Sequence, residues 1–183
     1  MPPNKRKQSR DEKRDEIVDA ARQLFVDDGY DATSMSRIAQ SAGVAPNTIY
    51  WYFRDKDAVL LAVLDAVLAD SAAEYLAIAD KPVSELVLWL IETLDRSSRL
   101  VTAVHARISH SGELNAWHDR FHQTTEAAFR HAMARDGVPA ERLDSEIKIG
   151  VFTIEGILTH DLSEDEKRAI CNSLTARWAP ATA

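Results

Sequence analysis

The chain has 183 residues, of which 45% are hydrophobic and 28% are charged, so it is long enough for one or two small domains with a buried core. Glycine and proline contribute only six residues each, which excludes collagen-like and low-complexity chains. Cys171 is the single cysteine, so no internal disulfide forms and we expect a reducing, cytoplasmic environment. No apolar run approaches the length of a membrane span, and no secretory signal is expected.

The charge is distributed unevenly along the chain. The net charge of −7 by itself argues against nucleic-acid binding. Residues 1–60, however, contain ten Lys or Arg and ten Asp or Glu, so the whole acidic excess falls in residues 61–183. The neutral segment begins with a basic arm of Lys5, Arg6, Lys7 and Arg10. The arm is either a solvated tail or a DNA contact, and the distribution is typical of a protein that touches phosphate at one end only.

The first two helices have clear start and stop signals. Ser9 and Glu12 have the spacing of a capping box, and the apolar residues that follow recur with helical period as far as Gly29, where we expect the first helix to end. Ser34 can cap a short second helix. Gly43 ends that helix, because glycine adopts turn conformations that side-chain-bearing residues adopt poorly.

The rest of the chain also predicts helices. A third short helix begins near Pro46, whose missing N–H costs nothing in a first turn. Asp55 is expected to cap a long fourth helix to about Ala79, and Pro82 prevents its continuation. Five further helices are predicted at 83–98, 99–110, 113–136, 139–160 and 163–178. The sequence therefore predicts an all-α fold of about nine helices.

The segment from Thr33 to Lys56 carries the strongest functional signal. Two short helices joined by a tight turn at Gly43 have the helix-turn-helix layout. The second of them is expected to expose Pro46, Asn47, Thr48 and Trp51. An asparagine can pair with adenine, and threonine or proline can contact a thymine methyl group in the major groove. This pattern indicates that the segment reads DNA.

The aromatic run at residues 50–53 allows two interpretations. The four rings could fill the core, and a helix pair with an intervening glycine is common in α-proteins. Four consecutive side chains cannot all face one side of a helix, however. If Tyr50 and Phe53 are buried, Trp51 and Tyr52 lie largely outside, where exposed aromatics suit DNA or a partner.

These blocks resemble a known family. Thr33–Val44 is similar to the TetR/AcrR pattern, and Thr48–Leu60 is still more similar. Ile17–Gly29 followed by Tyr30 also matches, so the resemblance covers roughly residues 13–62. Beyond this first third of the chain, only the number, lengths and order of the helices match.

The resemblance implies two domains with different functions. A helix-turn-helix DNA-binding domain would occupy residues 1–54, and a helical ligand-binding and dimerisation domain would occupy residues 55–183. The implied DNA-binding residues are Ser34, Ser36, Arg37, Pro46, Asn47, Thr48, Trp51, Tyr52 and Lys56. Ser34 would hold a phosphate at the start of the second helix, and Lys56 would neutralise another. One cap is absent, because Ala45 stands where family members often have Ser or Thr.

The last two helices are the expected dimer interface. Helix-turn-helix proteins normally bind as dimers, because operators are two-fold symmetric. The family expectation is a four-helix bundle, and Gly150 and Gly156 could permit close helix approach. The expected interface residues are Ile147, Val151, Ile154, Leu158, Ile170, Leu174 and Trp178. The alternative is that both stripes pack only within the monomer.

The middle helices are expected to hold a pocket that is mostly apolar with a few polar groups. The candidate ligand-binding residues are Trp89, His105, Ser109, Trp117, Phe121, Thr125, Phe129, Phe152 and Glu155, although aromatic residues at helical spacing can also be plain core. His118 and His122 have metal-ligand spacing. Because no cysteine or carboxylate spacing completes a recognisable site, we expect surface histidines and neither a metal nor a cofactor.

The predicted function is that of a ligand-responsive regulator. A homodimer would bind a palindromic double-stranded DNA operator as a repressor, and a small-molecule effector would release it. The alternatives are a ligand-independent DNA-binding accessory protein whose body only dimerises, and a helical enzyme or interaction module. No Gly-rich phosphate loop, nucleophile elbow or zinc-protease histidine pair is present, so we do not expect an enzyme.

Overall fold

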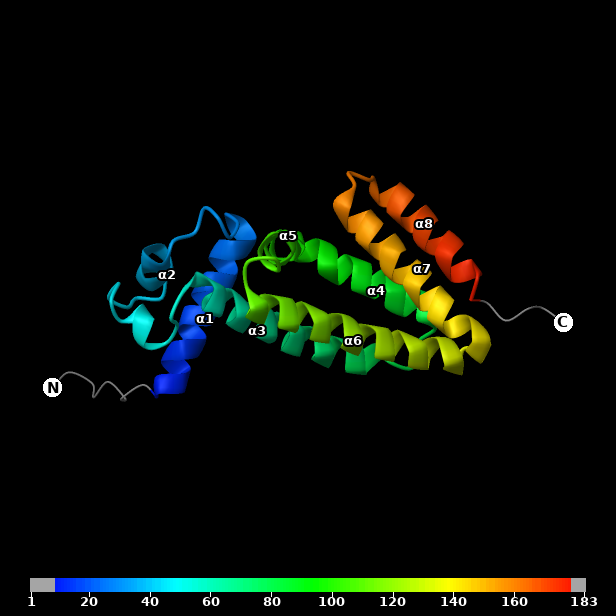
Figure 1. Ribbon diagram of the computed structural model, residues 1–183, viewed down its shortest axis with the longest axis horizontal. Coiled ribbons are helices and arrows are strands. Elements are labelled where there is room, and N and C mark those ends of the chain that lie inside the picture. The colour runs from blue at the N-terminus through cyan, green and yellow to red at the C-terminus, as the bar shows by residue number, and fades with distance from the viewer. Residues whose placement is uncertain (1–8, 179–183) are drawn as a thin grey trace. The chain divides into compact units, whose positions relative to one another are not determined.

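The computed structural model describes residues 9–178, which form eight α-helices, one 3-10 helix and no strand (Figure 1). The helices are α1 (Arg10–Asp27), α2 (Met35–Ser41), the 3-10 helix η1 (Ile49–Trp51), α3 (Lys56–Ile78), α4 (Val83–Arg96), α5 (Ser98–Arg107), α6 (Gly112–Arg135), α7 (Ala140–Thr159) and α8 (Glu164–Ala176). The predicted all-α fold is confirmed. Lys5, Arg6 and Lys7 of the basic arm lie outside the described residues.

The chain divides into two compact units. The first consists of Met1–Asp70 and Arg99–Asn115, and the second of Ser71–Ser98 and Ala116–Ala183. The first unit therefore contains α1, α2, η1, the first part of α3 and nearly all of α5, and the second contains α4, α7, α8 and most of α6. None of the helices within residues 9–178 combines the length and apolarity that crossing a lipid bilayer requires.

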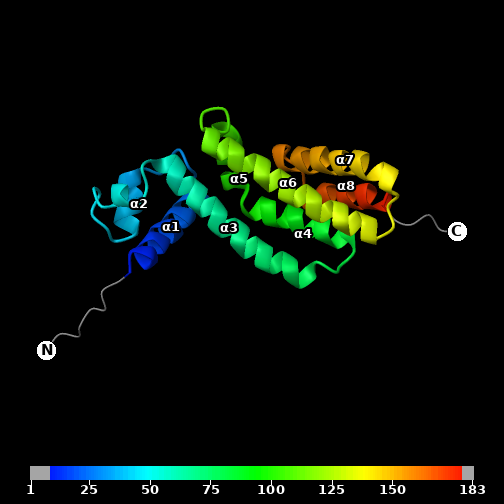
Figure 2. The same ribbon diagram turned by 60° about the horizontal axis from the view of Figure 1, so that its bottom comes forward.

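The first unit is built around the packing of α1 on α2, which Figure 2 shows. The predicted capping box at the start of α1 is confirmed, because Ser9 Oγ accepts a hydrogen bond from the Glu12 N–H at 3.0 Å, and Glu12 Oε2 accepts one from the Ser9 N–H at 2.9 Å. The core of this unit is apolar and closed to solvent. Its largest fully buried side chains include Ile17, Phe25, Ile38, Ile49 and Leu60.

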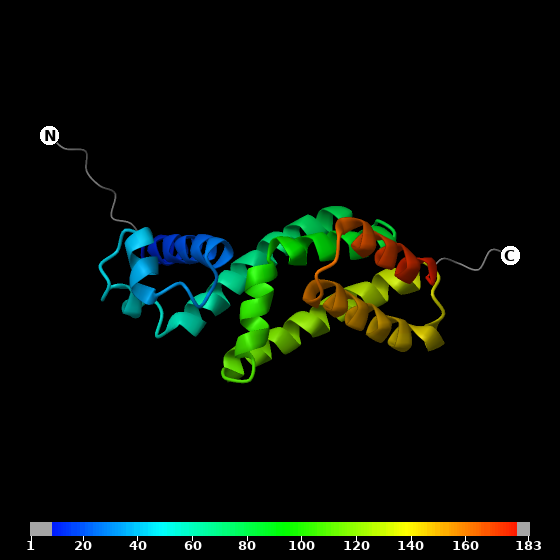
Figure 3. The same ribbon diagram turned by 90° about the horizontal axis from the view of Figure 1, so that it is seen from above.

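The second unit is a helical bundle in which α4 packs against both α7 and α8. Figures 1 and 3 show the hairpin that α7 and α8 form. Ser163 and Glu166 form a second capping box, at the start of α8. The core of the unit gathers apolar side chains from α4, α6, α7 and α8 and from the residues that follow α6 and α8, namely Val83, Leu86, Val87, Ile91, Ala132, Met133, Val138, Leu143, Ile147, Ile157, Cys171, Leu174 and Trp178.

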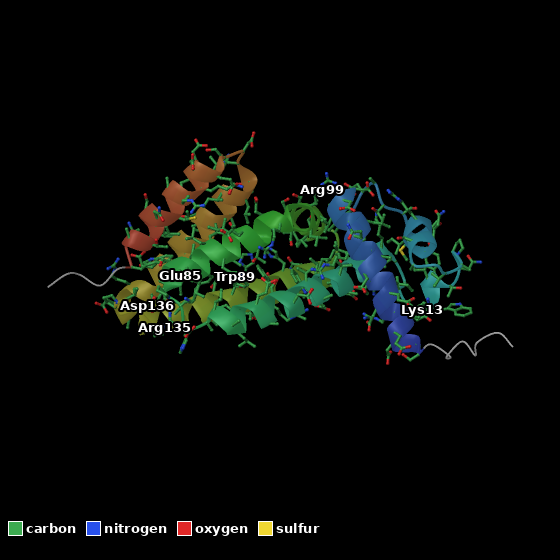
Figure 4. The ribbon with its side chains drawn as sticks, turned by 180° about the vertical axis from the view of Figure 1, so that it is seen from behind. Lys13, Glu85, Trp89, Arg99, Arg135 and Asp136 are labelled. Atoms are coloured by element: carbon green, nitrogen blue, oxygen red, sulfur yellow. The ribbon has the colours of Figure 1, made fainter. Side chains whose placement is uncertain are left out.

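Two residues at the end of α6 fix the loop between α3 and α4. Arg135 donates hydrogen bonds to the carbonyl oxygens of Ala79 and Lys81, and Asp136 Oδ2 accepts the Val83 N–H at 2.7 Å. Arg135 and Asp136 lie together near Glu85 in the first turn of α4 (Figure 4). They therefore satisfy carbonyls that follow α3 and an N–H at the start of α4, which helix ends otherwise leave unpaired.

Candidate nucleic-acid interface

The segment between α2 and α3 is a turn followed by η1, and not the short α-helix that the sequence predicted. The Thr48 N–H bonds the Ala45 carbonyl at 2.8 Å, and the Trp51 N–H bonds the Thr48 carbonyl at 3.1 Å. These are i→i+3 bonds, which close a tighter turn than an α-helix. The segment is short and must end before α3. It therefore has too few residues to offset the entropy cost of nucleating an α-helix, and it adopts the 3-10 turn.

This turn orients the aromatic run. Ile49 is buried and Phe53 is only 4% exposed, whereas Trp51 is 74% exposed, as the sequence predicted for Trp51. Tyr50, which the apolar pattern grouped with Phe53, is 55% exposed, because the 3-10 turn directs Ile49 but not its neighbour into the core. Tyr52 is half-buried. The surface that we call the reading segment comprises residues 46–51, whose Pro46, Asn47, Tyr50 and Trp51 are exposed and whose Thr48 is half-buried.

Two arginines near the start of α1 contact the end of the reading segment and the aromatic residue beyond it. Arg10 Nη2 donates a hydrogen bond to the Trp51 carbonyl at 3.3 Å. The Arg14 guanidinium lies 5.1 Å from the centroid of the Phe53 ring, a cation–π distance. Two basic side chains of α1 thus contact Trp51, the last residue of η1, and Phe53, two residues beyond it.

Helix α2 exposes the other predicted contacts. Ser34 caps the helix, since its Oγ accepts the Arg37 N–H at 3.2 Å. Ser36 and Arg37 are exposed, whereas the next residue, Ile38, is fully buried. Arg37 Nη2 forms an ion pair with Asp28 at 2.7 Å. The guanidinium therefore has an anionic partner in the protein with which a DNA phosphate would compete.

The Lys56 side chain makes contacts within the protein that the sequence did not predict. Its Nζ donates hydrogen bonds to the Tyr30 carbonyl at 2.7 Å and to the Thr33 carbonyl at 2.9 Å, and it lies 4.0 Å from the centroid of the Tyr30 ring. Burial is the main reason that the pKa of Lys56 lies below its ordinary value. Because the ammonium is occupied by these protein groups, the expected direct contact with a phosphate is not the role that this geometry favours.

Asp57 completes a polar cluster that sequence reasoning missed. Its carboxylate accepts hydrogen bonds from the Tyr30 hydroxyl and from Arg107, whose Nε and Nη2 lie 3.2 Å and 2.8 Å from the two Asp57 oxygens. Burial alone would raise the pKa of Asp57, but the hydrogen bonds from Arg107 and Tyr30 outweigh it and lower the pKa. Burial and the neighbouring carboxylate raise the pKa of Tyr30. We call Tyr30, Lys56, Asp57 and Arg107 the α3 cluster.

Comparison with known proteins agrees with this arrangement. Residues 17–63 match the sequence profile of the family described as bacterial regulatory proteins, tetR family. The HTH-type transcriptional regulator SrpR of Pseudomonas putida is 29% identical over 92% of this chain and 85% of its own length. These matches make the chain similar to TetR/AcrR regulators, with the DNA-binding domain of the family at residues 17–63. The chain is therefore a DNA-binding transcriptional regulator and not an enzyme.

Two further TetR/AcrR comparisons show how the likeness is distributed. The HTH-type transcriptional regulator AcrR of Shigella flexneri is 46% identical, but only over 28% of this chain and 24% of its own length. A TetR transcription regulator from Haloarcula marismortui has the same fold, with a TM-score of 0.77 over 92% of this chain and 97% of that one, at 15% identity. The likeness to AcrR is thus confined to a short stretch of sequence, whereas the Haloarcula marismortui protein shares the fold over nearly the whole chain.

Several of the predicted ligand-binding residues of the second unit contact one another. Trp117 is buried, and its ring stacks on that of Phe121 with centroids 5.6 Å apart. Phe121 also meets His122 edge-on, and His122 Nε2 lies 3.9 Å from Glu155 Oε1 on α7. Thr125, one turn further along α6, is half-buried.

Other predicted ligand-binding residues lie elsewhere. Phe152 is 70% exposed, so it does not line an interior pocket, and His105 and Ser109 are exposed residues of the first unit. Phe129 packs against the core, and Trp89 Nε1 donates to Glu74 at 3.3 Å. The Nε2 atoms of His118 and His122 lie 3.1 Å apart, but within residues 9–178 no group of three His, Cys, Asp or Glu is placed to hold a metal ion.

The predicted dimer residues pack within the second unit. Ile147, Leu174 and Trp178 belong to its buried core, Val151, Ile154 and Ile170 pack against that core, and Leu158 is half-buried. The periodic stripe of α7 and α8 therefore packs largely within its own unit. The large apolar side chains that α7 leaves exposed are Ile149, at 38%, and Phe152.

Proposed function

We propose that this protein is a homodimeric repressor that binds a two-fold symmetric operator and leaves it when a small molecule binds the second unit. The observation that carries the proposal is the reading segment, which exposes Asn47, Pro46 and Trp51 beside α2. An amide can recognise adenine and the apolar groups can contact thymine methyls, while Trp51 can contact the sugar-phosphate backbone.

The exposed apolar pair on α7 supports dimerisation. Ile149 and Phe152 lie three residues apart, and therefore on one face of the helix. Exposed large apolar side chains that lie together mark interaction surfaces. A two-fold dimer would pair this face with the same face of a second copy, and it would supply the two reading segments that a palindromic operator requires.

The effector is proposed to bind near Trp117, Phe121 and His122. Stacked rings next to an imidazole and the Glu155 carboxylate have the chemistry of a small-molecule site, in which few polar groups orient an apolar ligand. An effector that prefers the non-binding conformation would lower DNA affinity through a two-state equilibrium. This chemistry favours an aromatic or otherwise apolar molecule with one polar group.

The effector is tested by a thermal-shift screen of such molecules, followed by DNA binding. The DNA probe is a duplex that the protein selects from a random pool. We expect at least one compound to raise the melting temperature and to weaken binding to this duplex, and Phe121→Ala to abolish both effects. If compounds bind but never change DNA affinity, the ligand-independent accessory protein is the better description.

The dimer surface is tested separately by sedimentation analysis. Phe152→Glu places a charge on the proposed interface, and we expect it to convert dimers into monomers. Leu76→Glu is the matched control, because Leu76 is an equally exposed apolar residue, at 76%, on α3. A dimer that survives Phe152→Glu and dissociates with Leu76→Glu would contradict the assignment to α7.

A further inference from the structure

The α3 cluster links the loop that enters α2 to the last residue of α5, all within the first unit. We propose that Lys56 serves DNA binding as a positioning residue that fixes this loop, and that Arg107 holds the arrangement in place through Asp57. The proposal concerns DNA affinity itself. It therefore stands or falls independently of whether an effector exists.

The loop that Lys56 contacts is tightly closed. Thr33 is 1% exposed, its Oγ1 donates to the Gly29 carbonyl at 2.9 Å, and its N–H donates to the Tyr30 carbonyl at 3.2 Å. Lys56 Nζ bonds the Tyr30 and Thr33 carbonyls together. Since Ser34, the cap of α2, follows Thr33 directly, these bonds determine where α2 begins and hence where Ser36 and Arg37 lie.

A direct phosphate contact would have to use the single N–H donor that this arrangement leaves, or else break one of its bonds. An ammonium has three N–H donors, and two of those of Lys56 already bond carbonyl oxygens. Hydrogen bonds from a charged donor are among the stronger ones in proteins, and a buried carbonyl that loses its donor carries a desolvation cost. The structure therefore favours a role for the Lys56 ammonium in holding the Tyr30 and Thr33 carbonyls.

Two consecutive residues at the start of α3 hold opposite ends of one tyrosine. Lys56 bonds the Tyr30 carbonyl, and Asp57 accepts the Tyr30 hydroxyl. Arg107 then pairs with Asp57, whose side chain is only 15% exposed. Removal of Arg107 would leave a poorly hydrated carboxylate with Tyr30 as its remaining neutral donor, and it would remove the guanidinium that lies 5.8 Å from the centroid of the Tyr30 ring, against which Lys56 packs.

The first test compares Lys56→Met with the control Lys81→Met, which removes the same charge from an exposed site in the second unit. Binding to the selected duplex is measured by fluorescence anisotropy over a series of KCl concentrations. A lysine that neutralises a phosphate contributes about 0.9 to the slope of log affinity against log salt. A positioning lysine contributes nothing to the slope.

We expect Lys56→Met to bind on the order of tenfold more weakly than wild type, with an unchanged slope, and Lys81→Met to bind as wild type does. A slope reduced by about 0.9 for each lost phosphate contact, or an unchanged affinity, would overturn the proposal. If Lys56→Met is unfolded at the assay temperature by circular dichroism, Arg107→Gln decides the matter, since it leaves Lys56 in place.

The second test is a double-mutant cycle with Arg107→Gln and Asp57→Asn. We expect each variant to weaken binding severalfold with an unchanged salt slope, and the double variant to bind no more weakly than the weaker single variant, because both act through one ion pair. Melting temperatures above the assay temperature separate this effect from unfolding. Wild-type affinity in Arg107→Gln, or fully additive losses, would contradict the role of Arg107.

Discussion

The indole Nε1 of Trp178 donates a hydrogen bond to Glu146 Oε2 at 3.0 Å in the buried part of the second unit. Arg142 and Arg177 also donate to the Glu146 carboxylate, whose side chain is only 3% exposed. Burial alone would raise the pKa of Glu146, but the hydrogen bonds from Arg177, Arg142 and Trp178 outweigh it and lower the pKa to about 2. This carboxylate ties the end of α8 to α7.

Glu146→Gln is expected to lower the free energy of unfolding by about 2 kcal/mol, because it removes the anion that two arginines and an indole share. Chemical denaturation near neutral pH measures the change. Glu141→Gln on the same helix is the control, since Glu141 is exposed. Equal losses in the two variants would show that the buried network contributes nothing of its own.

The same carboxylate predicts a pH dependence. A folded-state pKa below the ordinary 4.5 means that ionised Glu146 stabilises the fold above about pH 4.5 and that this contribution is lost as the pH falls towards 2. We therefore expect wild type to lose more stability than Glu146→Gln between about pH 6 and about pH 3. A difference between the two proteins that stays constant over this range would contradict the assignment.

Gly43→Ala tests the turn that follows α2. Gly43 has a φ of +66°, and a Cβ added there would meet nothing within 4 Å, so the cost is one of backbone conformation alone. We expect a loss of about 1–2 kcal/mol in unfolding free energy. Gly112→Ala, where φ is ordinary and the space is also open, should cost nothing. The turn would need another explanation if both substitutions had the same effect.

Trp51→Ala is expected to weaken binding to every DNA sequence while leaving stability within about 0.5 kcal/mol of wild type, because the side chain is largely exposed. Anisotropy with the selected duplex and with a scrambled duplex measures the first effect, and thermal denaturation the second. Leu76→Ala removes a similarly exposed apolar side chain and should change neither. Loss of binding to the selected duplex alone would assign Trp51 to base recognition instead.

Features that depend on a few neighbouring residues could be predicted from the sequence. Ser9 with Glu12 and Ser163 with Glu166 specify both capping boxes, because each needs only a hydroxyl and a carboxylate three residues apart. Gly43 specifies a turn for the same local reason. The helix that was predicted near Pro46 became a 3-10 turn, since period alone does not distinguish the two in so short a segment.

Features that depend on distant partners could not be predicted. Lys56 contacts carbonyls 26 and 23 residues away, and Arg107 lies 50 residues from Asp57. Side chains at helical spacing also show that a face is buried without showing what buries it. Trp178 was therefore assigned to an interface between subunits, although its own unit encloses it.

The central claim is that the reading segment recognises bases, and the most direct measurement is the specificity ratio of Asn47→Ala. This ratio compares the affinity for the selected duplex with that for a scrambled one. An amide paired with a base contributes about 1–3 kcal/mol of discrimination, so the account predicts a ratio at least about tenfold lower, with scrambled-duplex binding unchanged. Asn172→Ala, an exposed asparagine on α8, should keep the wild-type ratio. A wild-type ratio in Asn47→Ala, or an equal loss of affinity for both duplexes, would contradict the claim.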